Sequence, residues 1–252
     1  MIGPVLVGME SSGRTRDALL ARGVDAISCD LLATASPGPH IEGDLFHNLQ
    51  RDHRSGRPWA AGLFHPTCTY HVVAAAWAFA DPDLDRYPDK GGYHQRVKPG
   101  TLVGAERRAA RAAAEADLER IRLAPLVLKI VENPRGTIST RLPGYGRPCD
   151  VVQPYEFGAD ASKATCLWAF NREGRKVPLH LPRDPAAYVA PRWVETPTGP
   201  RPRWGNQTDG GQNRETPGDD RWSVRSETYP GIAAALAEAI YQFCRVRAGA
   251  AL

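Results

Sequence analysis

A chain of 252 residues, of which 42% are hydrophobic, is long enough to form one large domain with a real core. The formal charge of +4 is compatible with a nucleic-acid partner but excludes a histone-like polybasic tail, and the apolar stretches are too short to span a membrane. Five cysteines, an odd number without a CxxC pair or a secretory leader, indicate reduced thiols in a cytosolic protein.

The first thirty residues read as strand, small-residue turn, helix, strand and acid. Residues 9–14 (Met-Glu-Ser-Ser-Gly-Arg) form the turn, and Asp30 is the acid. This order is typical of a nucleotide-binding βαβ unit, in which small residues let the backbone approach a ligand and the carboxylate accepts hydrogen bonds from ribose hydroxyls. An ordinary βα turn explains the same residues, so this segment alone leaves both interpretations open.

Apolar runs and helical spacing alternate along the rest of the chain. Strands are expected at residues 5–8, 24–29, 40–45, 59–65, 126–131, 151–153 and 164–170. Helices are expected at residues 15–22, 45–50, 72–80, 101–123 and 229–247. This order predicts an α/β protein with a doubly wound, mostly parallel sheet. The predicted parts are an α/β domain over 1–170, an irregular substrate-contacting region or lid over 171–227, and a returning helix over 228–252.

Two strand ends carry residues with chemical potential. Cys68 lies on the loop that follows the strand at 59–65, and Glu132-Asn133 ends the continuous apolar run at 126–131. Reactive groups of open α/β sheets lie at such carboxyl ends. A buried structural thiol and a strand-end salt bridge are the alternatives for Cys68 and Glu132. A metal cluster of His65, Cys68 and His71 matches no usual zinc spacing, so no metal is expected.

In the order of these parts the chain resembles the cytosine-C5 DNA methyltransferases, and most closely the short phage-type members without a separate target-recognition domain. The resemblance covers residues 5–170 and resumes at the final helix. It implies a class I, Rossmann-like methyltransferase fold, S-adenosylmethionine as cofactor, and the cytoplasm of a bacterial or phage-infected cell as location. The residues assigned by this resemblance to the cofactor are Met9, Glu10, Ser11, Ser12, Gly13, Asp30, Leu31, Asp44, Leu45 and Pro66. Asp44 is equally explained as the N-cap of the following helix.

The resemblance also assigns the reaction. The Pro-Pro-Cys loop of the family reads Pro66-Thr67-Cys68 here, and its Glu-Asn pair is Glu132-Asn133. The family's two arginines on a later strand are replaced by Lys163 and Thr165. The resulting catalytic set is Cys68, Glu132, Asn133 and Lys163. The resulting substrate-binding set is Thr67, Thr165 and Arg225.

The resemblance implies a role for each of these residues in the methylation of a cytosine ring. Attack of the Cys68 thiolate on C6 makes C5 nucleophilic, Glu132 shares a proton with N3, and Asn133 orients the loop or the base amino group. Lys163 is the candidate for polarising the O2 carbonyl, with a plain surface charge as the alternative.

The sequence leaves three hypotheses for the function of the protein. The first is C5 methylation of cytosine in DNA, which requires base flipping. The second is the same chemistry on a free cytidine or deoxycytidine nucleotide or on a single strand, which the small size and mild charge favour. The third is a catalytically weak relative that binds cofactor or DNA, suggested by the replaced proline and arginines. In the irregular region, Trp193, Trp204 and Trp222 suit either stacking on nucleobases or packing of a lid.

Overall fold

One sheet of seven strands organises the protein. The computed structural model describes residues 4–49, 58–90, 92–94, 97–214 and 227–249. The strands are β1 (Val5–Gly8), β2 (Ala26–Asp30), β3 (His40–Glu42), β4 (Ala61–Phe64), β5 (Leu128–Pro134), β6 (Asp150–Val152) and β7 (Thr165–Asn171). Their spatial order is β3-β2-β1-β4-β5-β7-β6, and only β7 runs antiparallel to its neighbours. The predicted mostly parallel, Rossmann-like sheet is confirmed.

The strand order reverses between β1 and β4, which are paired in parallel. At such a switch point the loops that follow the two strands leave toward opposite faces and open a crevice for a ligand. Phe64 of β4 is in register with Val131 of β5. The next position on each strand is therefore His65 on one and Glu132 on the other, side by side at the carboxyl edge of the sheet.

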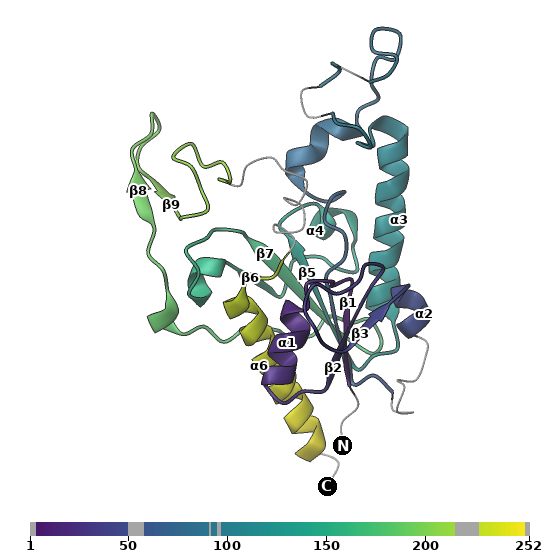
Figure 1. The fold of residues 1–252 in the computed structure, drawn as a ribbon, viewed down its shortest axis with the longest axis vertical. Coiled ribbons are helices and arrows are strands. Elements are labelled where there is room, and N and C mark those ends of the chain that lie inside the picture. Colours follow the sequence, from purple (N-terminus) through teal and green to yellow (C-terminus); the bar gives the residue numbers. More distant parts are fainter. Residues whose placement is uncertain (1–3, 50–57, 91, 95–96, 215–226, 250–252) are drawn as a thin grey trace.

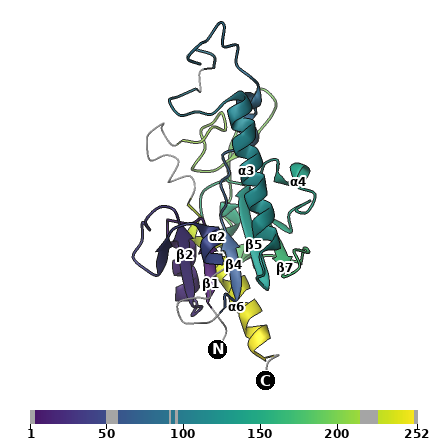
Figure 2. The same cartoon turned by 90° about the vertical axis from the view of Figure 1, so that its right-hand side faces the viewer.

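Helices cover both faces of the sheet, as expected for a doubly wound fold (Figures 1 and 2). One face packs against α1 (Arg14–Ala21) and α6 (Pro230–Gly249) through a cluster that includes Leu19 and Leu236. The other face packs against α2 (Leu45–Leu49), α3 (Gly104–Leu123) and the short α4 (Ile138–Arg141). No helix in the described part of the chain is long and apolar enough to cross a membrane.

Differences from the sequence expectation concentrate in short elements. The segment expected as a helix over 72–80 is the 3-10 helix η1 (Val73–Phe79), which is kinked at Ala75 and has no capping side chain at its start. The irregular region contains a hairpin of β8 (Arg192–Val194) and β9 (Arg201–Arg203), which projects from the body in Figure 1. Other elements not expected are α4, η2 (Pro154–Phe157) and η3 (Pro185–Ala187). Each is four residues or shorter, too short for a periodic signal.

A charged side chain is buried inside β5. Lys129 is completely buried, and its Nζ donates hydrogen bonds to the carbonyl oxygens of Ala124 (2.7 Å) and Arg172 (3.4 Å). Ala124 caps the C-terminus of α3, where a cation is favoured by the helix dipole. Burial is the main cause that lowers the pKa of Lys129 from 10.5 to about 8.

We predict that this lysine makes the stability of the fold increase with pH between 8 and 10.5. In that window the unfolded chain binds a proton at Lys129 that the folded chain does not bind, so raising the pH favours the folded state. At 1.36 kcal/mol per pKa unit, the free energy of unfolding of the wild type should gain about 3 kcal/mol relative to Lys129→Met across the window. Urea unfolding at a series of pH values measures this difference, and parallel stability curves would contradict it.

Candidate functional site

The loop that carries Cys68 is fixed to the sheet on both sides. The backbone N–H of His65 donates to the carbonyl oxygen of Gly8 at the end of β1 (3.0 Å). The side-chain amide of Asn133 on β5 donates to the carbonyl oxygen of Pro66 (2.8 Å), and Asn133 is completely buried. Cys68 itself is half-buried, which does not support the alternative of a buried structural thiol. The loop that carries this partly accessible thiol is therefore held at the carboxyl ends of β1 and β5.

Glu132 lies at the same edge of the sheet and pairs with a histidine. Its Oε2 is 3.2 Å from His65 Nδ1, and the side chains of the two residues are only 12% and 9% exposed. The other ring nitrogen of His65, Nε2, is 3.4 Å from the hydroxyl of Thr15, which is fully buried in the first turn of α1. Glu132 thus has a partner at the strand end, as its structural alternative requires, and that partner is His65.

Lys163, two residues before β7, and Thr165, the first residue of β7, lie on the side of Glu132 that faces this strand. Thr165 is buried, and its hydroxyl donates to the carbonyl oxygen of Lys163 (3.2 Å). Both Thr165 and the positive charge of Lys163 help to lower the pKa of Glu132. Lys163 is half-buried, and its Nζ donates to the carbonyl oxygen of Glu227 at 3.4 Å. Both residues therefore lie near Glu132, and the half-buried Lys163 is more than a plain surface charge.

The protonation of Glu132 reflects opposing influences. Burial on its own would raise its pKa. The hydrogen bond and charge of His65, the charge of Lys163 and the side chain of Thr165 outweigh burial, so the pKa of Glu132 lies below its ordinary value. Glu132 is consequently a carboxylate at neutral pH, and it needs an external source before it can give a proton to a ligand.

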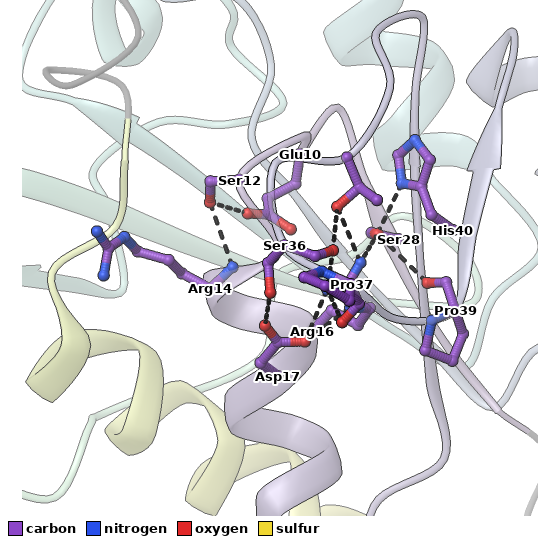
Figure 3. A network of polar contacts seen from close by, with 11 residues as sticks. Glu10, Ser12, Arg14, Arg16, Asp17, Ser28, Ser36, Pro37, Pro39 and His40 are labelled. Atoms are coloured by element: carbon purple, nitrogen blue, oxygen red, sulfur yellow. Dashed lines mark hydrogen bonds and ion pairs between the residues drawn. The ribbon is translucent and has the colours of Figure 1, made fainter.

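The turn after β1 has the backbone of a ligand-binding loop. Met9 adopts a left-handed conformation with φ of 58°, and Gly13, the N-cap of α1, has φ of 79°. A Cβ atom at Gly13 would lie 2.5 Å from Arg16 Nη2, so only glycine fits. Ser12 donates a hydrogen bond to Glu10 Oε1, while Glu10 Oε2 is buried without a partner among the described residues (Figure 3). An unpaired buried carboxylate oxygen is costly and fits a donor group of a ligand.

A buried arginine of α1 joins that helix to β2 and to the loop between β2 and β3 (Figure 3). Arg16 is completely buried, and its five N–H groups all donate hydrogen bonds. The acceptors are Asp17 Oδ1, Ser28 Oγ, Thr34 Oγ1 and the carbonyl oxygens of Ser36 and Pro37. The backbone N–H of Ala35 also donates to the carbonyl oxygen of Ser11 at 2.7 Å. These bonds fix the positions of the turn after β1 and of the β2–β3 loop at the carboxyl edge.

The predicted cofactor residues on β2 and β3 differ in accessibility. Asp30 ends β2 and is half-buried, and the next residue, Leu31, is 73% exposed. Asp44 is exposed, and its Oδ1 accepts a hydrogen bond from the backbone N–H of His47 (2.8 Å). Asp44 is therefore the N-cap of α2, which was the alternative to a role in cofactor binding. The side chain of Leu45 is buried in the core. Asp30 and Leu31 therefore remain available to a ligand, whereas the Leu45 side chain is used in packing.

A groove of about 290 Å³ adjoins the Cys68 loop. It is bounded by the turn after β1, the loop after β4 and the alanine face of α3; its lining residues are Met9, Pro66, Thr67, Tyr70, Ala110, Ala113, Ala114 and Asp117. Three of these were predicted from the sequence. A largely apolar hollow with few polar groups at a sheet switch point is a usual place for a small ligand.

Some residues predicted from the sequence to bind substrate are not among those that the structure describes. Arg225 falls beyond the described residues, as does Trp222. Among the described residues, no group of three or more histidine, cysteine, aspartate or glutamate side chains has the arrangement of a metal site. Sequence reasoning considered His65 only as a metal ligand and did not consider Thr15. The available signal for His65 was its position directly after a buried strand, as Glu132 directly follows the apolar run of the next strand.

Comparison of the chain with models of known protein families and with curated proteins gave no match.

We predict that Arg16→Lys destabilises the fold by about 3 kcal/mol. A lysine keeps the charge but has too few donors for the five acceptors, so several buried polar groups lose their partners. Chemical denaturation measures the loss, and faster amide exchange at Ala35 should accompany it. The matched control is Arg22→Lys, because Arg22 is an exposed arginine paired with Glu238, and its effect should be much smaller. Equal losses in the two variants would contradict the role assigned to Arg16.

Proposed function

We propose that the protein transfers a methyl group from S-adenosylmethionine to C5 of cytosine in DNA, through a covalent adduct between Cys68 and C6. The observation that carries this proposal is the bond between Asn133 and the carbonyl oxygen of Pro66, which ties the thiol loop to the strand end that bears Glu132. A thiol and a carboxylate at one crevice are what attack on a cytosine ring requires.

The residues at the carboxyl edge fit the proposed cofactor. The unpaired Oε2 of Glu10 suits an ammonium or hydroxyl donor, the half-buried Asp30 suits the ribose hydroxyls, and the exposed Leu31 suits one face of the adenine ring. The groove beside Met9 and Pro66 gives the cofactor a path toward Cys68. When bound there, the cofactor would supply an electrophilic methyl group.

The protein's own residues supply the remaining chemistry. The Cys68 thiolate attacks C6, and Glu132 delivers a proton to N3, so the ring becomes an enamine that is nucleophilic at C5. Lys163 holds its ammonium near Glu132 and suits the O2 carbonyl of the base. After transfer, loss of the C5 proton and release of the N3 proton expel the Cys68 thiolate and regenerate the site.

The β8–β9 hairpin supports a polymeric substrate. Trp193 on the hairpin is 66% exposed. Its neighbour Arg192 pairs with Asp209, and the opposite strand carries Arg201 and Arg203. The hairpin is anchored where Trp204 stacks on Tyr155 with ring centroids 4.1 Å apart. An exposed indole among guanidinium groups suits stacking on bases and contact with phosphates.

We predict that methyl transfer from labelled cofactor occurs on duplex DNA and is lost in Cys68→Ala. Single-stranded DNA and free cytidine nucleotides are assayed in parallel. The matched control is Cys149→Ala, which removes another half-buried thiol, one that donates to the Val177 carbonyl oxygen away from the site; it should retain activity. Glu132→Gln should lower the rate by roughly 10²- to 10⁴-fold.

A duplex that contains 5-fluorocytosine tests the adduct directly. Fluorine at C5 cannot leave as a cation, so the Cys68 adduct should accumulate as a denaturant-resistant protein–DNA species that depends on the cofactor. Transfer to nucleotides alone would move the substrate from DNA to free nucleotides. Cofactor binding without transfer to any substrate would contradict the proposed enzymatic activity. That result would favour a catalytically weak protein that only binds cofactor or DNA.

A further inference from the structure

His65 occupies the centre of a buried hydrogen-bond chain that the proposed reaction does not yet use. The chain runs from the Thr15 hydroxyl to His65 Nε2 (3.4 Å) and from His65 Nδ1 to Glu132 Oε2 (3.2 Å). Its members come from α1, from the residue after β4 and from β5. The bond from the His65 backbone N–H to Gly8 fixes the base of the imidazole side chain at the edge of the sheet.

Thr15 allows His65 to change protonation state without losing a partner. A hydroxyl both donates and accepts, so it can donate to an unprotonated Nε2 or accept from a protonated Nε2. Glu132 likewise accepts from Nδ1–H as a carboxylate and can donate to Nδ1 as a carboxylic acid. His71 shows the contrast, since it is 1% exposed and neither of its ring nitrogens has a partner among the described residues.

Glu132 needs such a neighbour. Its pKa is held below the ordinary value, so at neutral pH the carboxyl group has no proton to give to a cytosine ring. The His65 imidazole is in direct contact with Oε2, and its ring nitrogen can carry a proton to that oxygen.

We propose that His65 holds the proton that Glu132 passes to cytosine N3, and that Thr15 keeps His65 hydrogen-bonded in each protonation state. This inference rests on the proposed function. His65 touches no substrate atom in this scheme, so it is a positioning residue that acts through Glu132.

The proton balance closes within the site. Before attack the pair is imidazolium and carboxylate. The Nδ1 proton moves to Glu132, Glu132 transfers a proton to N3 as the Cys68–C6 bond forms, and His65 is left neutral. On elimination the Cys68–C6 bond breaks, N3 returns its proton to Glu132, and Glu132 returns it to His65. The C5 proton leaves separately to a solvent base, and the thiolate is restored.

The pH dependence of methyl transfer tests this role. In His65→Asn, Glu132 must take its proton from solution, so the rate at pH 8 should fall by about 10²-fold. On the alkaline side, the pH at which half of the activity is lost should be lower in the variant than in the wild type by at least about one unit. Thr15→Val, which removes the partner of Nε2, should shift the profile in the same direction by a smaller amount. Thr15→Ser keeps the hydroxyl and should retain the wild-type profile. The exposed His180, changed to Asn, is the matched control.

A titration that does not depend on activity accompanies the assay. The Glu132 carboxyl group is followed by carbon NMR in the wild type and in His65→Asn. Because burial remains when His65 is removed, the pKa of Glu132 should rise in the variant. Circular dichroism checks folding, and if His65→Asn does not fold, the Thr15→Val and Thr15→Ser profiles decide.

The possible results separate the inference from the proposed function. Wild-type transfer with a profile of unchanged shape in His65→Asn would make His65 purely structural and overturn the inference alone. An unchanged Glu132 titration in the variant would also overturn it. No transfer by the wild type to any substrate would overturn the proposed function and the inference together.

Discussion

The hydrogen bond from the Asn133 amide to the Pro66 carbonyl oxygen is the contact on which the candidate site depends. Strands β4 and β5 are already adjacent, but their pairing in register ends at Phe64 and Val131. Beyond that point the His65 N–H bond to the Gly8 carbonyl oxygen holds the chain to β1, and the Asn133 bond adds a connection to β5 on the other side. The buried Asn133 amide extends the connection past the end of the sheet. The loop thereby acquires the rigidity of the strand next to it.

Two pairs of buried polar residues in this protein differ in hydrogen bonding. Arg16 and Lys129 donate to backbone and side-chain acceptors inside the fold, and they hold loops and a helix end in place. Glu10 Oε2 and Asn133 Oδ1 are buried at the carboxyl edge without partners among the described residues. Since unpaired buried oxygens are costly, their presence where β1 and β5 end is better explained by a ligand than by folding. In these two pairs, complete hydrogen bonding accompanies a structural role, and the incompletely bonded oxygens lie at the candidate site.

The sequence was sufficient for features encoded by neighbouring residues. The apolar runs that became β1 and β5 were found because burial on both faces gives a local signal, and the chemical groups were sought where those runs end. The expected strand end at 131 was three residues short, because β5 continues through Glu132 and Asn133 to Pro134. Arg16 was missed because its acceptors lie on residues up to 21 positions away and nothing in the helical spacing indicates a buried arginine. Thr15 and His65 were missed for the same reason, because their contact spans 50 residues and exists only once α1 packs beside β4. Local sequence patterns therefore did not reveal the hydrogen bonds between segments that are far apart in the chain.

The resting charge of Glu132 has a consequence for when the site becomes reactive. In the free protein His65 and Lys163 favour the carboxylate, and burial opposes them. A flat base entering the crevice would remove the remaining solvent and strengthen the burial effect, while its N3 offers an acceptor for a protonated carboxyl group. Both changes move the balance of the His65–Glu132 pair toward protonated Glu132. Under the proposed mechanism the acid is therefore formed by the arrival of the base, which links proton delivery at N3 to occupancy of the site beside Cys68.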